Sequence, residues 1–157
     1  MGGFRSSRWS NGYERALTVQ ECYCIKASFF KNRLHNRNGF EGYCPIQKQY
    51  PYECIKARCE LILPYFQNPA AKILFEYPFC DEPPIQVHQN LQFNSTRPIV
   101  GGERWWFICP ECGVIRSHLY VVPGEEHFVC REDGGLVYAS NLKTHTRQSI
   151  NGYFANR

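Results

Sequence analysis

The feature that most constrains this chain is a pair of metal-ligand motifs in its C-terminal third. Cys109 and Cys112 stand three positions apart and are followed by Gly113. In such a turn both sulfur atoms can point towards one tetrahedral ion, and glycine fits where the backbone folds beneath the metal. Seventeen residues separate Cys112 from Cys130, and Asp133 follows three positions later. This gap is typical of paired zinc knuckles, so the sequence predicts a zinc ribbon.

The second motif leaves three alternatives for the fourth position of the site. Asp133 stands where a paired knuckle would carry its second cysteine, and a carboxylate binds Zn²⁺ at about 2 Å. His127 or His118 could supply a nitrogen ligand instead. The third alternative is a degenerate, metal-free site that packing holds together. A bound zinc ion is expected to be structural, because an isolated ribbon has little core of its own.

The chain has nine cysteines, and the six outside this motif are expected to be small buried side chains. Their spacing matches no familiar metal-binding motif. The first residues lack the apolar region of a secretory signal, so we expect a reducing, cytoplasmic location without disulfides. No apolar run approaches the ~20 residues of a membrane span. The six are Cys22, Cys24, Cys44, Cys54, Cys59 and Cys80.

The remaining pattern predicts an α+β fold. Thr18 and Glu21 form a capping-box pattern ahead of apolar residues at helical spacing, which predicts a helix over about 18–34. Nine of the ten prolines lie between Cys44 and Pro110 and disfavour long helices there. Short runs of β-branched and aromatic residues predict strands instead. These strands are expected at 55–59, 61–63, 73–75, 85–88, 91–94, 104–108, 118–122 and 127–130.

We expect three regions: a basic arm and helix over 1–40, a small antiparallel β region over 41–100, and a zinc ribbon with a helical tail over 101–157. The net charge of +4 is divided unevenly along the chain. Residues 1–37 carry five more bases than acids, and residues 140–157 carry three more bases than acids. Residues 38–139 carry four more acids than bases. A basic head and tail favour a localised anionic partner.

Nucleic acid is the anionic partner that the residue types favour. Arginine outnumbers lysine twelve to six, and aromatic residues lie among the arginines of the first fifteen positions. Arginine binds phosphate and guanine, while aromatic rings stack on bases. Trp9 could alternatively dock the arm onto its own domain. The residues expected to contact nucleic acid are Arg5, Arg8, Trp9, Arg15 and Arg147.

Catalysis is not the expected function, because common hydrolase, metalloprotease and nucleotide-loop motifs do not occur in the sequence. The leading hypothesis is therefore a non-enzymatic, nucleic-acid-binding accessory or regulatory protein. One alternative is a protein-interaction subunit or inhibitor that docks on a nucleoprotein or host-defence complex. Its contact surface would be acidic, with Glu76, Asp81 and Glu82 beside Tyr77 and Phe79. A metal-dependent nuclease or hydrolase is a third hypothesis.

Several segments resemble a family of small bacterial proteins found among phage and mobile-element genes. This chain begins MGGFRSSRW, which is similar to the MGGFGSGRW opening of that family. The resemblance implies a zinc-ribbon protein of a phage or mobile element. The family's second knuckle resembles C-R-x-C, whereas Asp133 replaces its second cysteine here. The similar segments are 1–9, 18–22, 101–113, 119–120, 128–131 and 136–138.

Overall fold

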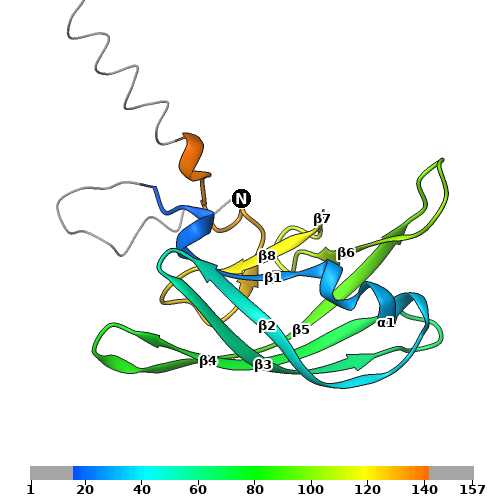
Figure 1. Ribbon diagram of the computed structural model, residues 1–157, viewed down its shortest axis with the longest axis horizontal. Helices are drawn as coiled ribbons and strands as arrows, with labels where there is room; N and C mark the ends of the chain where they lie inside the picture. Colours follow the sequence, from blue (N-terminus) through cyan, green and yellow to red (C-terminus); the bar gives the residue numbers. More distant parts are fainter. Residues whose placement is uncertain (1–15, 142–157) are drawn as a thin grey trace, which may run out of the picture.

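The computed structural model describes residues 16–141, which form one curled antiparallel sheet of nine strands (Figure 1). The order of the strands across the sheet is β7-β6-β5-β4-β3-β2-β1-β8-β9. The strands are β1 (Tyr23–Lys26), β2 (Phe40–Gln49), β3 (Tyr52–Ile62), β4 (Ala70–Phe79), β5 (Glu82–Thr96), β6 (Arg104–Ile108), β7 (Ile115–Arg116), β8 (His118–Val121) and β9 (Phe128–Val129).

The expected α+β fold with a small β region is therefore wrong. The sheet takes strands from all three expected regions of the chain, and the strands of the ribbon form both of its ends. The division into those three regions remains a prediction. No helix within residues 16–141 is long and apolar enough to cross a membrane.

The helix expected over 18–34 does not form as one element. Thr18 does form the capping box, because its N–H donates to Glu21 Oε2 at 3.0 Å. The box starts only a short 3₁₀ turn, η1 (Val19–Glu21), which is followed by β1. A second 3₁₀ turn, η2 (Ala27–Phe30), and one helical turn, α1 (Lys31–His35), complete the segment. β1 pairs with both β2 and β8, and these tertiary contacts override the local helical pattern.

Most of the expected strands are confirmed, but they merge into longer ones. The runs at 55–59 and 61–62 are parts of β3, which ends before Leu63, and those at 85–88 and 91–94 are parts of β5. The run at 104–108 matches β6. The sequence did not predict β2. Of the expected helical tail, residues 139–141 are helical and the rest lies outside the described residues.

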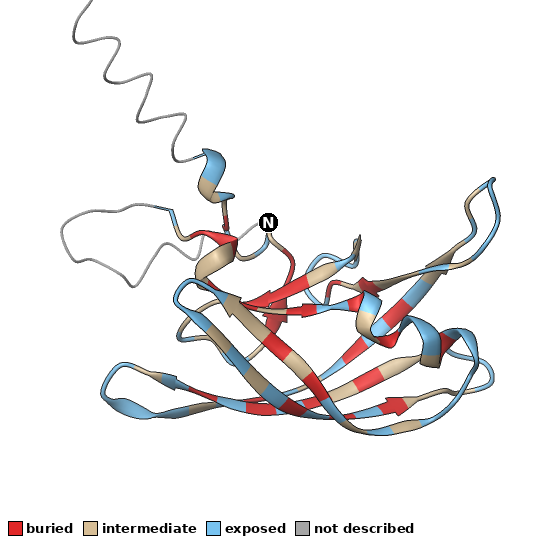
Figure 2. Ribbon diagram, in the orientation of Figure 1, coloured by how far each residue is buried: buried red, intermediate tan, exposed pale blue. Residues whose placement is uncertain are grey.

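The core fills the concave side of the sheet. Buried and exposed residues alternate along the long strands (Figure 2), as expected of a sheet with one solvated face. Aromatic rings meet inside the curl. The ring centroids of Phe93 in β5 and Phe107 in the neighbouring β6 are 4.9 Å apart. Those of Phe75 in β4 and Phe128 in the end strand β9 are 5.8 Å apart. The core therefore joins the middle of the sheet to both of its ends.

Side-chain hydrogen bonds also hold the curl closed. The Phe128 N–H of the end strand β9 donates to Gln89 Oε1 of β5 at 2.6 Å. The Tyr77 hydroxyl of β4 donates to Glu125 O at 2.7 Å and accepts from the Gly124 N–H at 3.0 Å. Because β9 does not pair with β4 or β5 in the sheet, these side chains satisfy backbone groups that strand pairing leaves open.

Candidate metal centre

Four potential metal ligands come together where the two ends of the curled sheet meet. Cys109 and Cys112 lie in the turn between β6 and β7, at one end of the strand order. Cys130 and Asp133 lie in the turn after β9, at the other end. One donor atom from each residue lies within 4.8 Å of the other three. An ion bound here would connect the two ends of the sheet.

The two turns share one backbone hydrogen bond. The Gly113 N–H donates to Cys109 O at 2.9 Å, and the Gly134 N–H donates to Cys130 O at 3.0 Å. In CPECG and CREDG, Asp133 thus takes the sequence position of Cys112, although Gly113 has a positive φ of 71° and Gly134 does not have a positive φ. We call Cys109 and Cys130 the inner cysteines, since both are buried, and the exposed Cys112 and Asp133 the outer ligands.

The distances between the donor atoms fit a tetrahedral ion. Cys112 Sγ and Cys130 Sγ are 3.8 Å apart. Zn–S bonds of ~2.3 Å place two sulfur atoms of a tetrahedral site about 3.8 Å apart. Asp133 Oδ2 lies 3.1 Å from Cys109 Sγ and 3.0 Å from Cys130 Sγ, within hydrogen-bonding distance of both thiols. The carboxylate oxygen therefore already faces the two inner sulfur atoms.

The environment of the cluster shifts the pKa values of its members. Burial raises the pKa of the Cys130 thiol to about 12. A hydrogen bond to Asp133 raises the pKa of Cys112, while hydrogen bonds from the thiols lower the pKa of Asp133. Backbone N–H groups point at the inner sulfur atoms: that of Cys130 lies 3.3 Å from Cys109 Sγ. Such donors favour the thiolate form, which is the form that binds metal.

A cation lies beside the cluster. Arg116 of β7 pairs with Glu132 at 3.2 Å. A hydrogen bond to Cys130 and the charge of Glu132 raise the pKa of the Arg116 guanidinium. With all four donors ionised, a divalent ion would leave the site negatively charged, and Arg116 would offset part of that charge.

Asp133, and neither histidine, completes the group of donor atoms. His127 Nε2 lies 3.7 Å from Glu111 Oε1, and His118 Nδ1 lies 2.7 Å from Ser117 Oγ. Among residues 16–141 the group of Cys109, Cys112, Cys130 and Asp133 is the one that brings such donors together. Three thiols and a carboxylate suit a tetrahedral site for a soft or borderline metal such as Zn²⁺.

The other cysteines form no second cluster in this part of the chain. Cys22, Cys44 and Cys59 are buried as expected. Cys54 and Cys80 are exposed, so the expectation of burial is wrong for these two. Cys54 is exposed because its position in β3 faces the solvated side of the sheet.

The residues expected to contact nucleic acid lie outside the described part of the chain; they are Arg5, Arg8, Trp9, Arg15 and Arg147. Residues near the two ends of the described part of the chain contact each other. The Val19 N–H donates to Val137 O at 3.0 Å, and the Val137 N–H donates to Leu17 O at 3.1 Å. Residues 17–19 and Val137 are therefore neighbours in space.

A basic surface surrounds α1. It was not predicted from the sequence as a separate surface. Residues 22–40 contain four bases and no acid. Lys26, Lys31 and Arg37 are exposed, whereas Arg33 is partly buried. We call these four residues the basic end. The signal that could have revealed it was the absence of acidic residues over this stretch.

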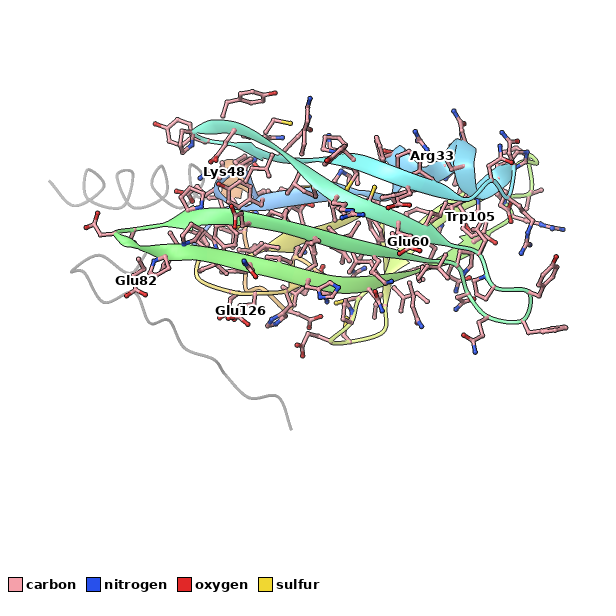
Figure 3. All side chains as sticks on the ribbon, turned by 90° about the horizontal axis from the view of Figure 1, so that it is seen from below. Arg33, Lys48, Glu60, Glu82, Trp105 and Glu126 are labelled. Carbon is pink, nitrogen blue, oxygen red and sulfur yellow. The ribbon has the colours of Figure 1, made fainter. Side chains whose placement is uncertain are left out.

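Charged residues of both signs lie towards each end of the sheet. Figure 3 shows Glu60 near Arg33 and Trp105, and Lys48 on the side of Glu82, the first residue of β5. The acidic contact surface proposed from the sequence would have included Tyr77. That side chain is only 1% exposed and lies in the core, so it is not available for such a contact.

Comparisons with known proteins give no match: no protein-family model, curated protein or solved structure is significantly similar to this chain. The resemblance to proteins of phages and mobile elements therefore remains a prediction. The features of the structure that bear on function are the cluster of potential metal ligands and the basic surface around α1.

Proposed function

We propose that the protein binds one structural zinc ion at Cys109, Cys112, Cys130 and Asp133. The observation that supports this proposal is the convergence of four donor atoms from two turns that share a backbone hydrogen bond. Four protein ligands complete a tetrahedral shell, which is the arrangement of structural rather than catalytic zinc. The ion would bridge the ends of the sheet and add its binding free energy to folding.

Thermal unfolding with zinc and with a chelator tests this proposal. We expect zinc to raise the melting temperature of the wild type and a chelator to lower it. Cys130→Ser should abolish the response, whereas Cys54→Ser, which removes an exposed thiol away from the cluster, should keep it. A wild-type melting temperature that responds to neither zinc nor chelator would overturn the proposal.

We further propose that the zinc-bound protein binds nucleic acid as an accessory or regulatory protein. The basic end supports this proposal, because three of its four bases are exposed within a segment that has no acidic residue. A cluster of exposed bases attracts a polyanion to the surface that carries it.

Salt dependence of binding is the test of this second proposal. We expect gel retardation of DNA or RNA at low salt that weakens steeply as salt rises. About four phosphate contacts to a single strand predict a slope of roughly −3 in a plot of log K against log salt. Affinity that does not change with salt, or no retardation of any single strand or duplex at low salt, would contradict it.

A further inference from the structure

Two thiols of the metal-ligand cluster lie close enough to react with each other. Cys112 Sγ and Cys130 Sγ are 3.8 Å apart. A disulfide holds its two sulfur atoms ~2.05 Å apart, so these atoms have to approach by a further ~1.7 Å. Both residues lie outside the paired strands, so such a movement need not disrupt a strand pairing. The cluster therefore offers a site for a disulfide as well as for a metal ion.

The two thiols differ in their access to solvent. Cys112 is exposed, whereas Cys130 is buried. An oxidant dissolved in water therefore reaches the Cys112 sulfur first. The Cys130 sulfur lies beside it and can attack the oxidised product. An exposed cysteine with a second cysteine next to it is a common arrangement in reversible redox sites.

Cys109 stands in the same turn as Cys112, but its sulfur is held towards the second turn. Cys109 Sγ accepts a hydrogen bond from the Cys130 N–H at 3.3 Å. The corresponding contact of Cys130 Sγ, with the Asp133 N–H, is longer at 3.5 Å. Movement towards Cys112 thus costs Cys109 the closer of these two contacts. The structure favours a bond between the turns over a bond within the first turn.

We propose that Cys112 and Cys130 form a reversible disulfide when no metal ion is bound and hydrogen peroxide is present. The Cys112 thiolate attacks one peroxide oxygen, the O–O bond breaks, and a sulfenic acid and hydroxide result. The Cys130 thiolate then attacks the Cys112 sulfur, the S–S bond forms, and a second hydroxide leaves. The two hydroxide ions take up the protons that the thiols lost. In total, the thiols lose two electrons and hydrogen peroxide becomes two molecules of water.

The disulfide and the metal ion exclude each other. Thiolates bind metal, and a disulfide contains none, so oxidation leaves only Cys109 and Asp133 as ligands. This part of the inference rests on the proposed zinc site. Because Cys112 follows β6 and Cys130 follows β9, the disulfide joins the same two ends of the sheet as the metal ion. The protein thus keeps a link between these ends when zinc is absent.

Disulfide mapping of the full chain tests the pairing. The wild type is stripped of metal with a chelator, treated with hydrogen peroxide, alkylated and digested without reduction. Mass spectrometry should find two peptides joined through Cys112 and Cys130, and dithiothreitol should separate them. A disulfide between Cys109 and Cys112 as the main product, or no disulfide within the cluster, would overturn the proposal.

Single variants and a denatured sample control this measurement. Cys109→Ser keeps the reacting pair and should still give the disulfide, whereas Cys130→Ser should leave Cys112 at the sulfenic acid or a higher oxidation state. Cys54→Ser removes an exposed thiol of β3 and should give the wild-type yield. Circular dichroism shows which samples are folded. An equal yield of the same disulfide from wild type in concentrated urea would show that the fold does not select this pair, which overturns the structural argument.

Zinc separates this inference from the proposed function. With free zinc at about ten times its dissociation constant, the disulfide should form about tenfold more slowly, because fewer than about one site in ten is then empty. Equal rates with and without zinc would overturn the mutual exclusion. If zinc raises the melting temperature but peroxide gives no bond between Cys112 and Cys130, this inference alone fails. If the disulfide forms but neither zinc nor chelator changes the melting temperature, the zinc site fails and the disulfide stands.

Discussion

The two turns that present the candidate metal ligands share one backbone hydrogen bond but differ in one donor and in the φ of the glycine that follows it. In each turn an inner cysteine is buried, and the glycine after the outer ligand donates to the carbonyl of that cysteine. The first turn places Cys112 at the outer position and the second places Asp133 there. The comparison indicates that the shared hydrogen bond is compatible with either a thiol or a carboxylate at the outer position.

The largest expected effect separates inner from outer ligands. Cys109→Ser or Cys130→Ser should cost more than ~4 kcal/mol of unfolding free energy in the presence of zinc, because a buried ligand and the metal are lost together. Cys112→Ser should cost less, because its side chain is exposed. Denaturant unfolding measures these losses, and Cys54→Ser should stay within ~0.5 kcal/mol of the wild type. Equal losses at inner and outer positions would contradict the distinction.

Exchange of the outer ligands tests whether the turns are equivalent. Asp133→Cys should tighten zinc binding, because it supplies a fourth thiolate, and Cys112→Asp should weaken it. The double variant Cys112→Asp/Asp133→Cys restores three thiolates and one carboxylate, and its zinc affinity should return close to that of the wild type. Competition with a chromophoric chelator measures the affinities. A double variant as weak as Cys112→Asp alone would show that the turns are not interchangeable.

Arg116 should affect metal affinity without being a ligand. Arg116→Gln removes the cation beside Cys130 and Glu132, and we expect zinc affinity to fall ~10- to 100-fold, as for other residues that support metal ligands. The same chelator competition measures the change. Arg58→Gln, on the outer face of the sheet, is the charge-matched control. Identical zinc affinities for the two variants would show that Arg116 does not support metal binding.

The smallest expected effects concern the glycines of the turns. Gly113 has a φ of +71°, and a Cβ there would meet no atom within 4 Å, so Gly113→Ala tests backbone strain alone, at about 1–2 kcal/mol. A Cβ at Gly134 would lie 3.2 Å from side-chain atoms of Leu136 and Val122. Gly134→Ala therefore tests packing, and its cost depends on how far those side chains move. Chemical denaturation with saturating zinc measures both variants.

The same comparison shows what sequence alone could predict. Both turns are local, so the spacing of Cys109, Cys112 and Cys130 was enough to predict three ligands. The fourth remained open, because the choice between Asp133 and a histidine depends on the position of β8 and β9 in space. His127 faces Glu111 instead, which no local pattern reveals.

The sheet was harder to predict because its pairings are distant in sequence. Ile25 suits both a helical face shared with Cys22 and Phe29 and a strand, and only the pairing of β1 with β8 about 95 residues later decides between them. The capping box at Thr18 forms as expected but starts only η1. Strand runs such as 104–108 were visible locally, whereas the merging of short runs into β3 and β5 depends on their neighbours.

Metal content of the purified chain tests the central claim most directly. Native mass spectrometry of the wild type, refolded with zinc and then desalted, should show one zinc ion per chain. Cys109→Ser/Cys130→Ser, treated in the same way, should show none, because only the outer ligands remain. A wild type that retains no zinc, or a double variant that retains as much as the wild type, would contradict the assignment of these four residues as the metal site.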